Sequence, residues 1–122
     1  MIGFDLQEVD RIQDAEKLLQ KIALPSEREY IQKFKCDFKM RVASLWAVKE
    51  ATFKALDLTE GEISYKEIEL CHKESGRPFI ALHGKALAQF EKLNGKGIDV
   101  SISHQKNVVG AVVVVLEPLP ND

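Results

Sequence analysis

The sequence predicts an α+β fold in which helices pack on a mostly antiparallel sheet. Short segments that alternate like strands occur at both ends of the chain. Segments with helical periodicity lie between them without a regular βαβ repeat, and hairpins dominate the second half. An irregular order of strands and helices with antiparallel hairpins is typical of this fold class.

The first predicted strand covers residues 2–6. It alternates between a face with Gly3 and Asp5 and an apolar face made of Ile2, Phe4 and Leu6. Because aspartate is a poor strand former, Asp5 either ends the strand or directs a carboxylate at a ligand. This segment alone leaves both interpretations open.

Three helices are predicted in the first half of the chain. Asp10 has the position of an N-cap for a helix over residues 11–22. Ser26 and Glu29 have the spacing of a capping box at the start of the second helix. The third helix is the longest, and Asp37 is its predicted cap.

The second half of the chain is predicted to hold two hairpins separated by a helix. Strands over 65–71 and 78–83 flank a turn, and a helix follows over 84–94. The last hairpin joins residues 99–104 to the valine-rich segment 108–116. Because β-branched residues favour buried strands, we expect the valine-rich strand at the centre of the sheet.

Composition narrows the class of protein. The 122 residues suit a single domain over residues 1–122, and a net charge of −2 argues against nucleic-acid binding. No apolar run approaches the roughly 20 residues of a spanning helix, so no membrane segment is expected. The N-terminus lacks the basic region of a signal peptide. Cys36 and Cys71 lack metal-type spacing, and we expect both to be reduced in a cytoplasmic protein.

Residues 44–56 place three charges in an otherwise apolar helix. Trp46, Glu50 and Lys54 share one row, each a turn apart. Charges among apolar side chains are costly to desolvate unless they are paired or bound to an ion, which suggests a functional site. The plain alternative is an ordinary i,i+4 ion pair. Trp46 is interpreted as a packing residue, and Lys49, off the row, as a surface or interface residue.

Ser103 and His104 stand at the mouth of the predicted final hairpin. A single histidine in a turn is more often a surface residue than a catalytic one, so this position acquires meaning only with the other motifs. His72 and His83 are interpreted as surface or strand-edge residues.

Three segments together resemble a known family. Residues 3–12 (GFDLQEVDRI), 46–54 (WAVKEATFK) and 100–104 (VSISH) follow the order of motifs in the holo-acyl-carrier-protein synthases, the small bacterial 4′-phosphopantetheinyl transferases. The turn containing Gly76 and Pro78 is similar to that family's Gly-x-Pro turn, which suggests that both residues line an adenine pocket. The resemblance covers nearly the whole chain.

The resemblance implies an enzyme of fatty acid biosynthesis. It would transfer 4′-phosphopantetheine from coenzyme A to a serine of apo acyl carrier protein, with Mg²⁺, and release adenosine 3′,5′-bisphosphate. Asp5 and Glu50 correspond to the metal ligands, and Glu50 is also a candidate general base. Lys54 would contact the phosphates. Ser103 and His104 would hold coenzyme A, with a base role for His104 as the weaker alternative.

The family also implies a homotrimer with active sites in clefts between protomers. Its acidic carrier substrate requires a basic docking patch, for which Arg11 is favoured because it matches the family motif. Other candidate cations are Lys17, Lys21, Arg28 and Arg41. The alternative is a solvated face of mixed charge, since Asp14 and Glu16 share the helix.

The chain departs from the family pattern at three places. Residues 57–61 replace a Gly-Thr-Gly turn, Leu45 stands where an arginine is common, and residues 24–26 replace a basic segment. Two other functions therefore stay under consideration. One is a transferase for a different carrier domain, although such dedicated enzymes are usually longer. The other is a non-catalytic module that binds Mg²⁺ and coenzyme A.

Overall fold

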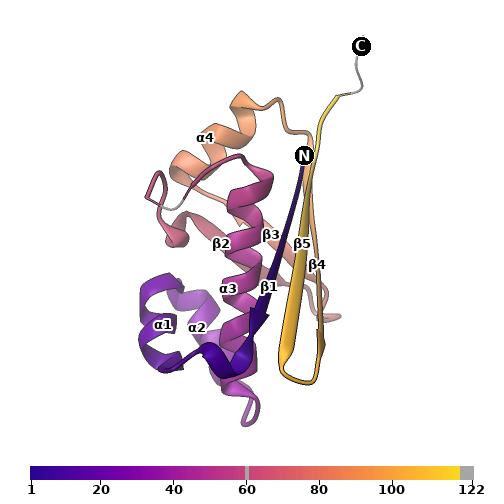
Figure 1. Ribbon diagram of the computed structural model, residues 1–122. Coiled ribbons are helices and arrows are strands. Elements are labelled where there is room, and N and C mark those ends of the chain that lie inside the picture. The colour runs from indigo at the N-terminus through magenta and orange to yellow at the C-terminus, as the bar shows by residue number, and fades with distance from the viewer. Residues whose placement is uncertain (60, 119–122) are drawn as a thin grey trace.

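The structure is a computed structural model that describes residues 1–59 and 61–118. Its elements are drawn in Figure 1. In chain order they are β1 (Ile2–Glu8), η1 (Val9–Arg11), α1 (Ala15–Ile22), α2 (Pro25–Gln32), α3 (Phe38–Ala55), η2 (Tyr65–Glu67), β2 (Ile68–His72), β3 (Pro78–Leu82), α4 (Gly84–Lys92), β4 (Gly97–Gln105) and β5 (Val108–Leu116).

Two antiparallel sheets confirm the predicted α+β class. One has three strands in the order β1-β5-β4, and the other is the β2-β3 hairpin. The valine-rich β5 is the central strand of the larger sheet, as expected. The long helix α3 runs beside this sheet, with α1 and α2 near one of its ends and α4 near the other (Figure 1).

The two faces of the larger sheet differ in what covers them. The face that packs on α3 is buried and includes Val109, Ala111, Val113 and Val115. The opposite face exposes large apolar side chains, and Ile2, Phe4 and Leu6 are 67%, 55% and 60% exposed. The apolar face of the first strand is therefore the outer one, and its Gly3 and Asp5 face the helix.

Gly3 determines how closely β1 approaches α3. A Cβ atom at this position would overlap the carbonyl oxygen of Ala51 and lie 2.7 Å from the backbone nitrogen of Ala55. Alanines on the helix and a glycine on the strand thus bring the two backbones together. Asp5, two residues further along the same face, is held against the helix by this contact.

The start predicted for the first helix is wrong, whereas α2 begins at Pro25. Asp10 does not cap a helix, because residues 9–11 form η1 and α1 begins only at Ala15. Asp14 is the N-cap, and its Oδ1 accepts a hydrogen bond of 3.1 Å from the Lys17 backbone. Since Asp14 and Asp10 precede the same apolar stripe, the pattern of residue types did not separate the two positions.

The capping box predicted for the second helix is also displaced. Glu27, rather than Glu29, reaches back to the helix start, where its Oε1 accepts a 2.8 Å hydrogen bond from the Leu24 backbone. Glu27 is buried, so it caps the helix from inside the fold rather than from solvent. Asp37 precedes α3 as predicted, with φ 60° and ψ 34°, but its side chain makes no capping hydrogen bond there.

Other predicted bounds shift by a few residues. The strand expected from residue 65 begins at Ile68, because residues 65–67 form η2. Cys36 and Cys71 are both free thiols, as expected. Burial raises the pKa of the Cys71 thiol. Among the helices that the structure describes, none combines the length and the apolar character that crossing a membrane requires.

Candidate active site

Asp5 and Lys54 meet where β1 crosses α3. The Lys54 ammonium lies 3.2 Å from Asp5 Oδ1 and donates a 2.9 Å hydrogen bond to the Phe4 carbonyl. The other oxygen of Asp5, Oδ2, accepts a 2.7 Å hydrogen bond from the Gln7 amide. Asp5 does not end the strand, since it pairs in register with Ala111. Its side chain, 11% exposed, points a carboxylate at the helix.

Glu50 lies one helical turn before Lys54 and has different partners. The Trp46 indole nitrogen donates to its Oε1 at 3.1 Å, and the Tyr65 hydroxyl donates to the same oxygen at 2.6 Å. Trp46 therefore holds a carboxylate in addition to packing against the core. Among the described residues, Lys54 forms its ion pair with Asp5 and not with Glu50, so the ordinary i,i+4 pair is absent.

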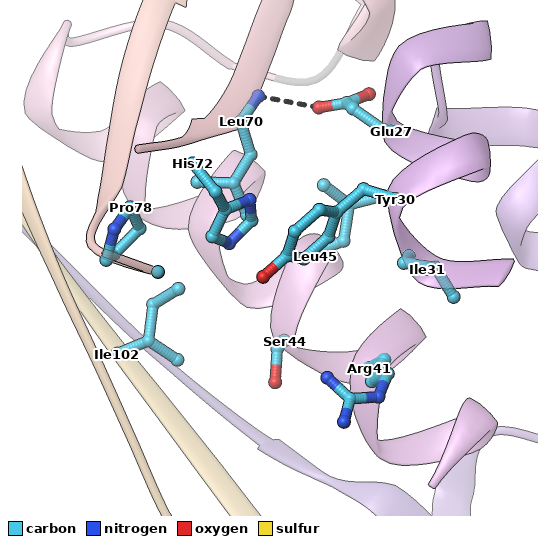
Figure 2. A pocket seen from close by; sticks show the side chains of 11 residues that line it. Glu27, Tyr30, Ile31, Arg41, Ser44, Leu45, Leu70, His72, Pro78 and Ile102 are labelled. Carbon is cyan, nitrogen blue, oxygen red and sulfur yellow. Dashed lines mark hydrogen bonds between the residues drawn. The ribbon is translucent and has the colours of Figure 1, made fainter. Parts of the chain in front are cut away.

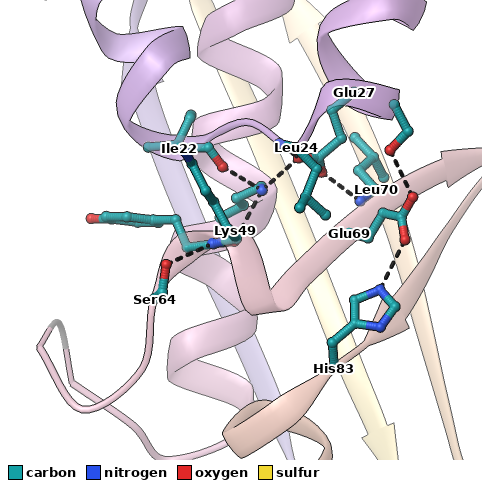
Figure 3. Close-up of polar contacts among 11 residues, drawn as sticks. Ile22, Leu24, Glu27, Lys49, Ser64, Glu69, Leu70 and His83 are labelled. Carbon is teal, nitrogen blue, oxygen red and sulfur yellow. Dashed lines mark hydrogen bonds and ion pairs between the residues drawn. The ribbon is translucent and has the colours of Figure 1, made fainter.

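Lys49 is fully buried, and its prediction as a surface or interface residue is wrong. Its ammonium donates to the Ile22 carbonyl at 2.6 Å, to Glu27 Oε1 at 2.7 Å and to the Tyr65 carbonyl at 3.0 Å (Figure 3). Burial lowers the pKa of Lys49, while the Glu27 carboxylate acts in the opposite direction. The burial of Lys49 could not be predicted from its position in the sequence, because only the tertiary fold brings these acceptors to residue 49.

Glu27 completes this buried polar cluster, which we define as Lys49, Glu27 and their hydrogen-bond partners. Glu27 Oε2 accepts a 2.7 Å hydrogen bond from the Leu70 backbone, and Oε1 serves both Lys49 and Leu24. The cluster joins the ends of α1 and α2 to α3, η2 and β2 (Figure 3). Every donor of the ammonium and both oxygens of the carboxylate are occupied, which is the arrangement that buried charges require.

Ser103 and His104 lie on β4, away from this helix surface. Ser103 is in register with Gly110, and Gly110 with Leu6, so its side chain shares the outer face of the sheet. Both residues are exposed and line a shallow hollow that also includes Phe4 and Leu6. Since Asp5 belongs to the inner face, one chain does not bring Ser103 to Asp5.

A separate cavity of about 260 Å³ opens beside the first half of α3 (Figure 2). Its lining includes Arg41 of α3, Gly76 of the turn between β2 and β3, and Pro78, the first residue of β3. The Tyr30 and His72 rings stack inside it, with centroids 3.8 Å apart and planes 5° from parallel. Such a mixture of flat rings, a guanidinium and apolar walls suits a ligand with a flat, anionic part.

His72 is the last residue of the edge strand β2 and is half-buried in this cavity, so of its two predicted placements it takes the strand edge. Burial lowers its pKa, and the positive charge of Lys33 lowers it further. His83 is exposed as predicted, with its Nε2 2.9 Å from Glu69 Oε1. Hydrogen bonds from Ser26 and His83 hold the pKa of Glu69 below its usual value.

The candidate docking cations are not equivalent. The Arg11 side chain is 81% exposed, and its Nε lies 3.6 Å from Glu8. Arg28 is engaged at 2.6 Å by Glu16, and the Arg41 guanidinium lies 3.6 Å from the centre of the Phe34 ring. Lys17 and Lys21 are exposed on α1.

Asp5 and Glu50 offer only oxygen ligands, which is the chemistry that Mg²⁺ prefers. Residues 1–59 and 61–118 contain no group of three or more His, Cys, Asp or Glu side chains arranged to hold a metal. Mg²⁺ commonly takes one or two carboxylates and completes its shell with water and substrate phosphates. The donor set fits that use.

Sequence reasoning missed Tyr65 and Glu27. Tyr65 was expected only as a strand residue, and nothing in the sequence connects its hydroxyl to Glu50. Glu27 follows Leu24 by three residues, the spacing of a helix-capping acid, and this signal could have found it.

Comparison with known proteins agrees with this architecture. Residues 1–112 match the family model of the 4′-phosphopantetheinyl transferase superfamily. The chain is 36% identical over 120 residues to the holo-[acyl-carrier-protein] synthase of Solidesulfovibrio magneticus, covering 93% of this chain and 95% of that protein. The corresponding Caldicellulosiruptor bescii protein is 37% identical over 116 residues, with coverage of 93% and 94%.

A solved structure shows the same fold. Helicobacter pylori holo-[acyl-carrier-protein] synthase in complex with coenzyme A superimposes with a TM-score of 0.81 at 30% identity, covering 95% of this chain and all of that one. The chain therefore belongs to the holo-[acyl-carrier-protein] synthase family of 4′-phosphopantetheinyl transferases.

Proposed function

We propose that this protein transfers 4′-phosphopantetheine from coenzyme A to a serine hydroxyl of apo acyl carrier protein, as a step of fatty acid biosynthesis in the cytoplasm. The observation that carries the proposal is the contact between Asp5 and Lys54 one helical turn from Glu50. The carboxylates of Asp5 and Glu50 and the ammonium of Lys54 thus belong to one region, where β1 crosses α3. Such a set suits a reaction between a hydroxyl and a pyrophosphate.

Asp5 and Glu50 are the residues that would hold Mg²⁺. When bound, the ion would neutralise charge on the pyrophosphate and fix its geometry. Asp5 is suited to this role because the close packing at Gly3 fixes its backbone against α3. Glu50 is suited because both donors bind Oε1, and no group of residues 1–59 and 61–118 donates a hydrogen bond to Oε2.

The reaction balances with the groups of this chain. The serine oxygen attacks the β-phosphorus of coenzyme A and forms the new P–O bond, while the pyrophosphate P–O bond breaks and adenosine 3′,5′-bisphosphate leaves with the electron pair. In this proposal Glu50 takes the serine proton, directly or through water, as the candidate general base. Lys54, which is 54% exposed, can reach the phosphates and compensate the charge that develops on them.

We further propose that the cavity beside α3 binds part of coenzyme A. Gly76 and Pro78 line it, in agreement with their expected place in an adenine pocket, and Arg41 brings a positive charge to it. A flat base and a phosphate are the chemical features that this lining would recognise. Arg41→Ala should therefore raise the KM for coenzyme A and leave the KM for the carrier protein nearly unchanged.

The outer face of the larger sheet supports a homotrimer with shared active sites. Its exposed apolar side chains form a patch of the kind that protein interfaces cover, and Ser103 shares that face. Because the exposed His104 lines the same hollow as Ser103, a neighbouring protomer that packs there could supply both residues to the Asp5–Glu50 site. Co-expressing inactive Glu50→Gln and His104→Ala chains should restore activity in mixed trimers, and a sedimentation measurement should give three chains per particle.

Arg11 is the proposed anchor for the acidic carrier protein, because its guanidinium is well exposed. Arg11→Ala should weaken the use of apo carrier far more than the binding of coenzyme A. An equal loss of both would contradict the docking role.

Mass spectrometry tests the proposed reaction directly. Apo acyl carrier protein incubated with this protein, coenzyme A and Mg²⁺ should gain one phosphopantetheine, and the gain should be absent with Glu50→Gln or a chelator. If coenzyme A binds but acyl carrier protein is not modified, a panel of other carrier domains separates a transferase of different specificity from a non-catalytic binding module. Transfer to another carrier would indicate a different specificity, and no transfer at all would indicate a binding module.

A further inference from the structure

We infer that Tyr65 and Trp46 are positioning residues that fix the carboxylate of Glu50 for metal-dependent transfer. The inference rests on the proposed function and extends it to two side chains outside the reacting groups. Its basis is a convergence of two neutral donors, one from α3 and one from η2, on a single carboxylate oxygen.

The two hydrogen bonds give the two carboxylate oxygens of Glu50 different environments. Oε1 accepts from the Tyr65 hydroxyl at 2.6 Å and from the Trp46 indole at 3.1 Å. Oε2 receives no hydrogen bond from residues 1–59 or 61–118. A carboxylate held in this way cannot rotate freely, so Oε2 keeps one orientation for a metal ion or a proton.

Tyr65 is itself held from two directions. Tyr65 is 8% exposed, and its ring packs against Phe53 with ring centroids 5.0 Å apart. Its backbone carbonyl accepts a 3.0 Å hydrogen bond from the buried Lys49 ammonium. The buried cluster of Lys49 and Glu27 therefore fixes the backbone of Tyr65, and the hydroxyl at the end of a rigid ring carries that position to Glu50.

Trp46 supplies the second donor from one turn earlier on the same helix. Its indole nitrogen can only donate, so it cannot compete with Glu50 for a metal ion. Lys54, on the next turn, turns instead to Asp5 and the Phe4 carbonyl. Glu50 is thus oriented by neutral groups, and its negative charge is not consumed by a salt bridge with the neighbouring lysine.

Trp46 also makes the inference measurable, because it is the single tryptophan of the chain. Mn²⁺ bound at Glu50 should quench its emission, since the indole contacts that carboxylate. We would titrate Mn²⁺ into the full-length protein with saturating coenzyme A and record the half-saturating concentration. For Tyr65→Phe, which removes only the hydroxyl, this concentration should rise about tenfold, as is typical when an outer partner of a metal ligand is lost.

A matched control removes a hydroxyl that serves an unrelated carboxylate. Ser26 donates to Glu69 Oε2 at 2.7 Å, on the surface and away from Glu50. Ser26→Ala should keep the Mn²⁺ half-saturation of the unmodified protein. If Tyr65→Phe matches Ser26→Ala in the Mn²⁺ titration while it keeps its melting temperature, the positioning role is overturned.

Two further variants separate this inference from the proposed function. Glu50→Gln should abolish the saturable quenching; if it leaves the quenching unchanged, Glu50 is not a metal ligand, and both its proposed metal role and the positioning role of Tyr65 and Trp46 fall. Quenching that Glu50→Gln abolishes and Tyr65→Phe leaves unaltered overturns the positioning role alone. Trp46→Phe removes the longer hydrogen bond, so it should raise the half-activating Mn²⁺ concentration in the transfer assay by a smaller factor than Tyr65→Phe.

Discussion

Lys49 and Lys54 lie five residues apart on α3, yet one is fully buried and the other is 54% exposed. Lys49 reaches three acceptors inside the fold, and its partner Glu27 has both oxygens occupied. Lys54 touches a single carboxylate and a carbonyl at the edge of solvent. Two lysines of one helix thus differ in whether their ammonium groups are accessible to a ligand.

The environments of the two lysines differ in their capacity to bind a substrate. A buried charge with a complete set of partners is stable only in that arrangement, and any substrate would have to break it. A half-exposed charge with few partners can exchange them for a phosphate at little cost. Access of the ammonium to solvent, more than the presence of charge, distinguishes Lys49 of the buried cluster from Lys54 of the candidate active site.

The largest expected effect follows from removing Lys49. Lys49→Met leaves the Glu27 carboxylate buried without its cation, which should cost about 3–5 kcal/mol in the free energy of unfolding. Urea denaturation measures this loss. The double variant with Glu27→Gln should recover part of it, and a loss below about 1 kcal/mol in Lys49→Met would show that the cluster is not structural.

The counterpart is Lys54→Met, which should separate activity from stability. Asp5 is buried but keeps its hydrogen bond from Gln7 and loses only a half-exposed cation, so Lys54→Met should cost about 1–2 kcal/mol, well below the cost of Lys49→Met. The rate of phosphopantetheine transfer should fall about 100-fold or more, because a charge that stabilises the transition state is lost. If stability and rate fell together, the contrast between the two lysines would be wrong.

Gly3→Ala tests the contact that holds the site on the helix. The added methyl group would overlap the Ala51 carbonyl and push β1 away from α3, at a cost of about 1–3 kcal/mol. Because Asp5 moves with the strand, transfer should weaken beyond what the lost stability explains. Gly61→Ala is a control for an added methyl group, since nothing lies within 4 Å of its Cβ position. The positive φ of Gly61 adds backbone strain, so this control is compared by activity per folded molecule.

His72 gives the smallest expected effect and an intermediate case between the two lysines. Its pKa is lowered in the folded state, so between that value and the ordinary 6.5 the unfolded chain binds more protons. Stability should therefore fall as the pH drops through this window. Replacing the ring by another aromatic in His72→Phe should reduce the drop in melting temperature between pH 7.5 and 5.5 by about 1–3 °C. An unchanged pH dependence would contradict this contribution.

Much of the fold was predictable from local patterns. The valine-rich segment predicted the central strand β5, and the periodicity around Trp46 predicted α3. Helix starts were less predictable because several acidic residues precede each apolar stripe. Asp14 rather than Asp10 caps α1, and the choice depends on how the preceding strand continues into η1.

The site was predicted unevenly. Motif order singled out Asp5, Glu50 and Lys54, and the structure brings Asp5 to Lys54. It does not bring Ser103 to them within one chain, because strand alternation places that side chain on the outer face. The buried role of Lys49 and the hydroxyl of Tyr65 were not predicted, since their partners come from segments distant in sequence.

The fold class, the family and the residue types of the candidate site follow from periodicity and motif order, which are properties of the chain. Which lysine is buried, which face of β1 meets α3 and which donors hold Glu50 depend on how the elements pack. Desolvation and hydrogen bonding are set by what surrounds a side chain, and local patterns do not contain that information. For Lys49 and Glu50, the decisive neighbours come from α2, η2 and the ends of other elements.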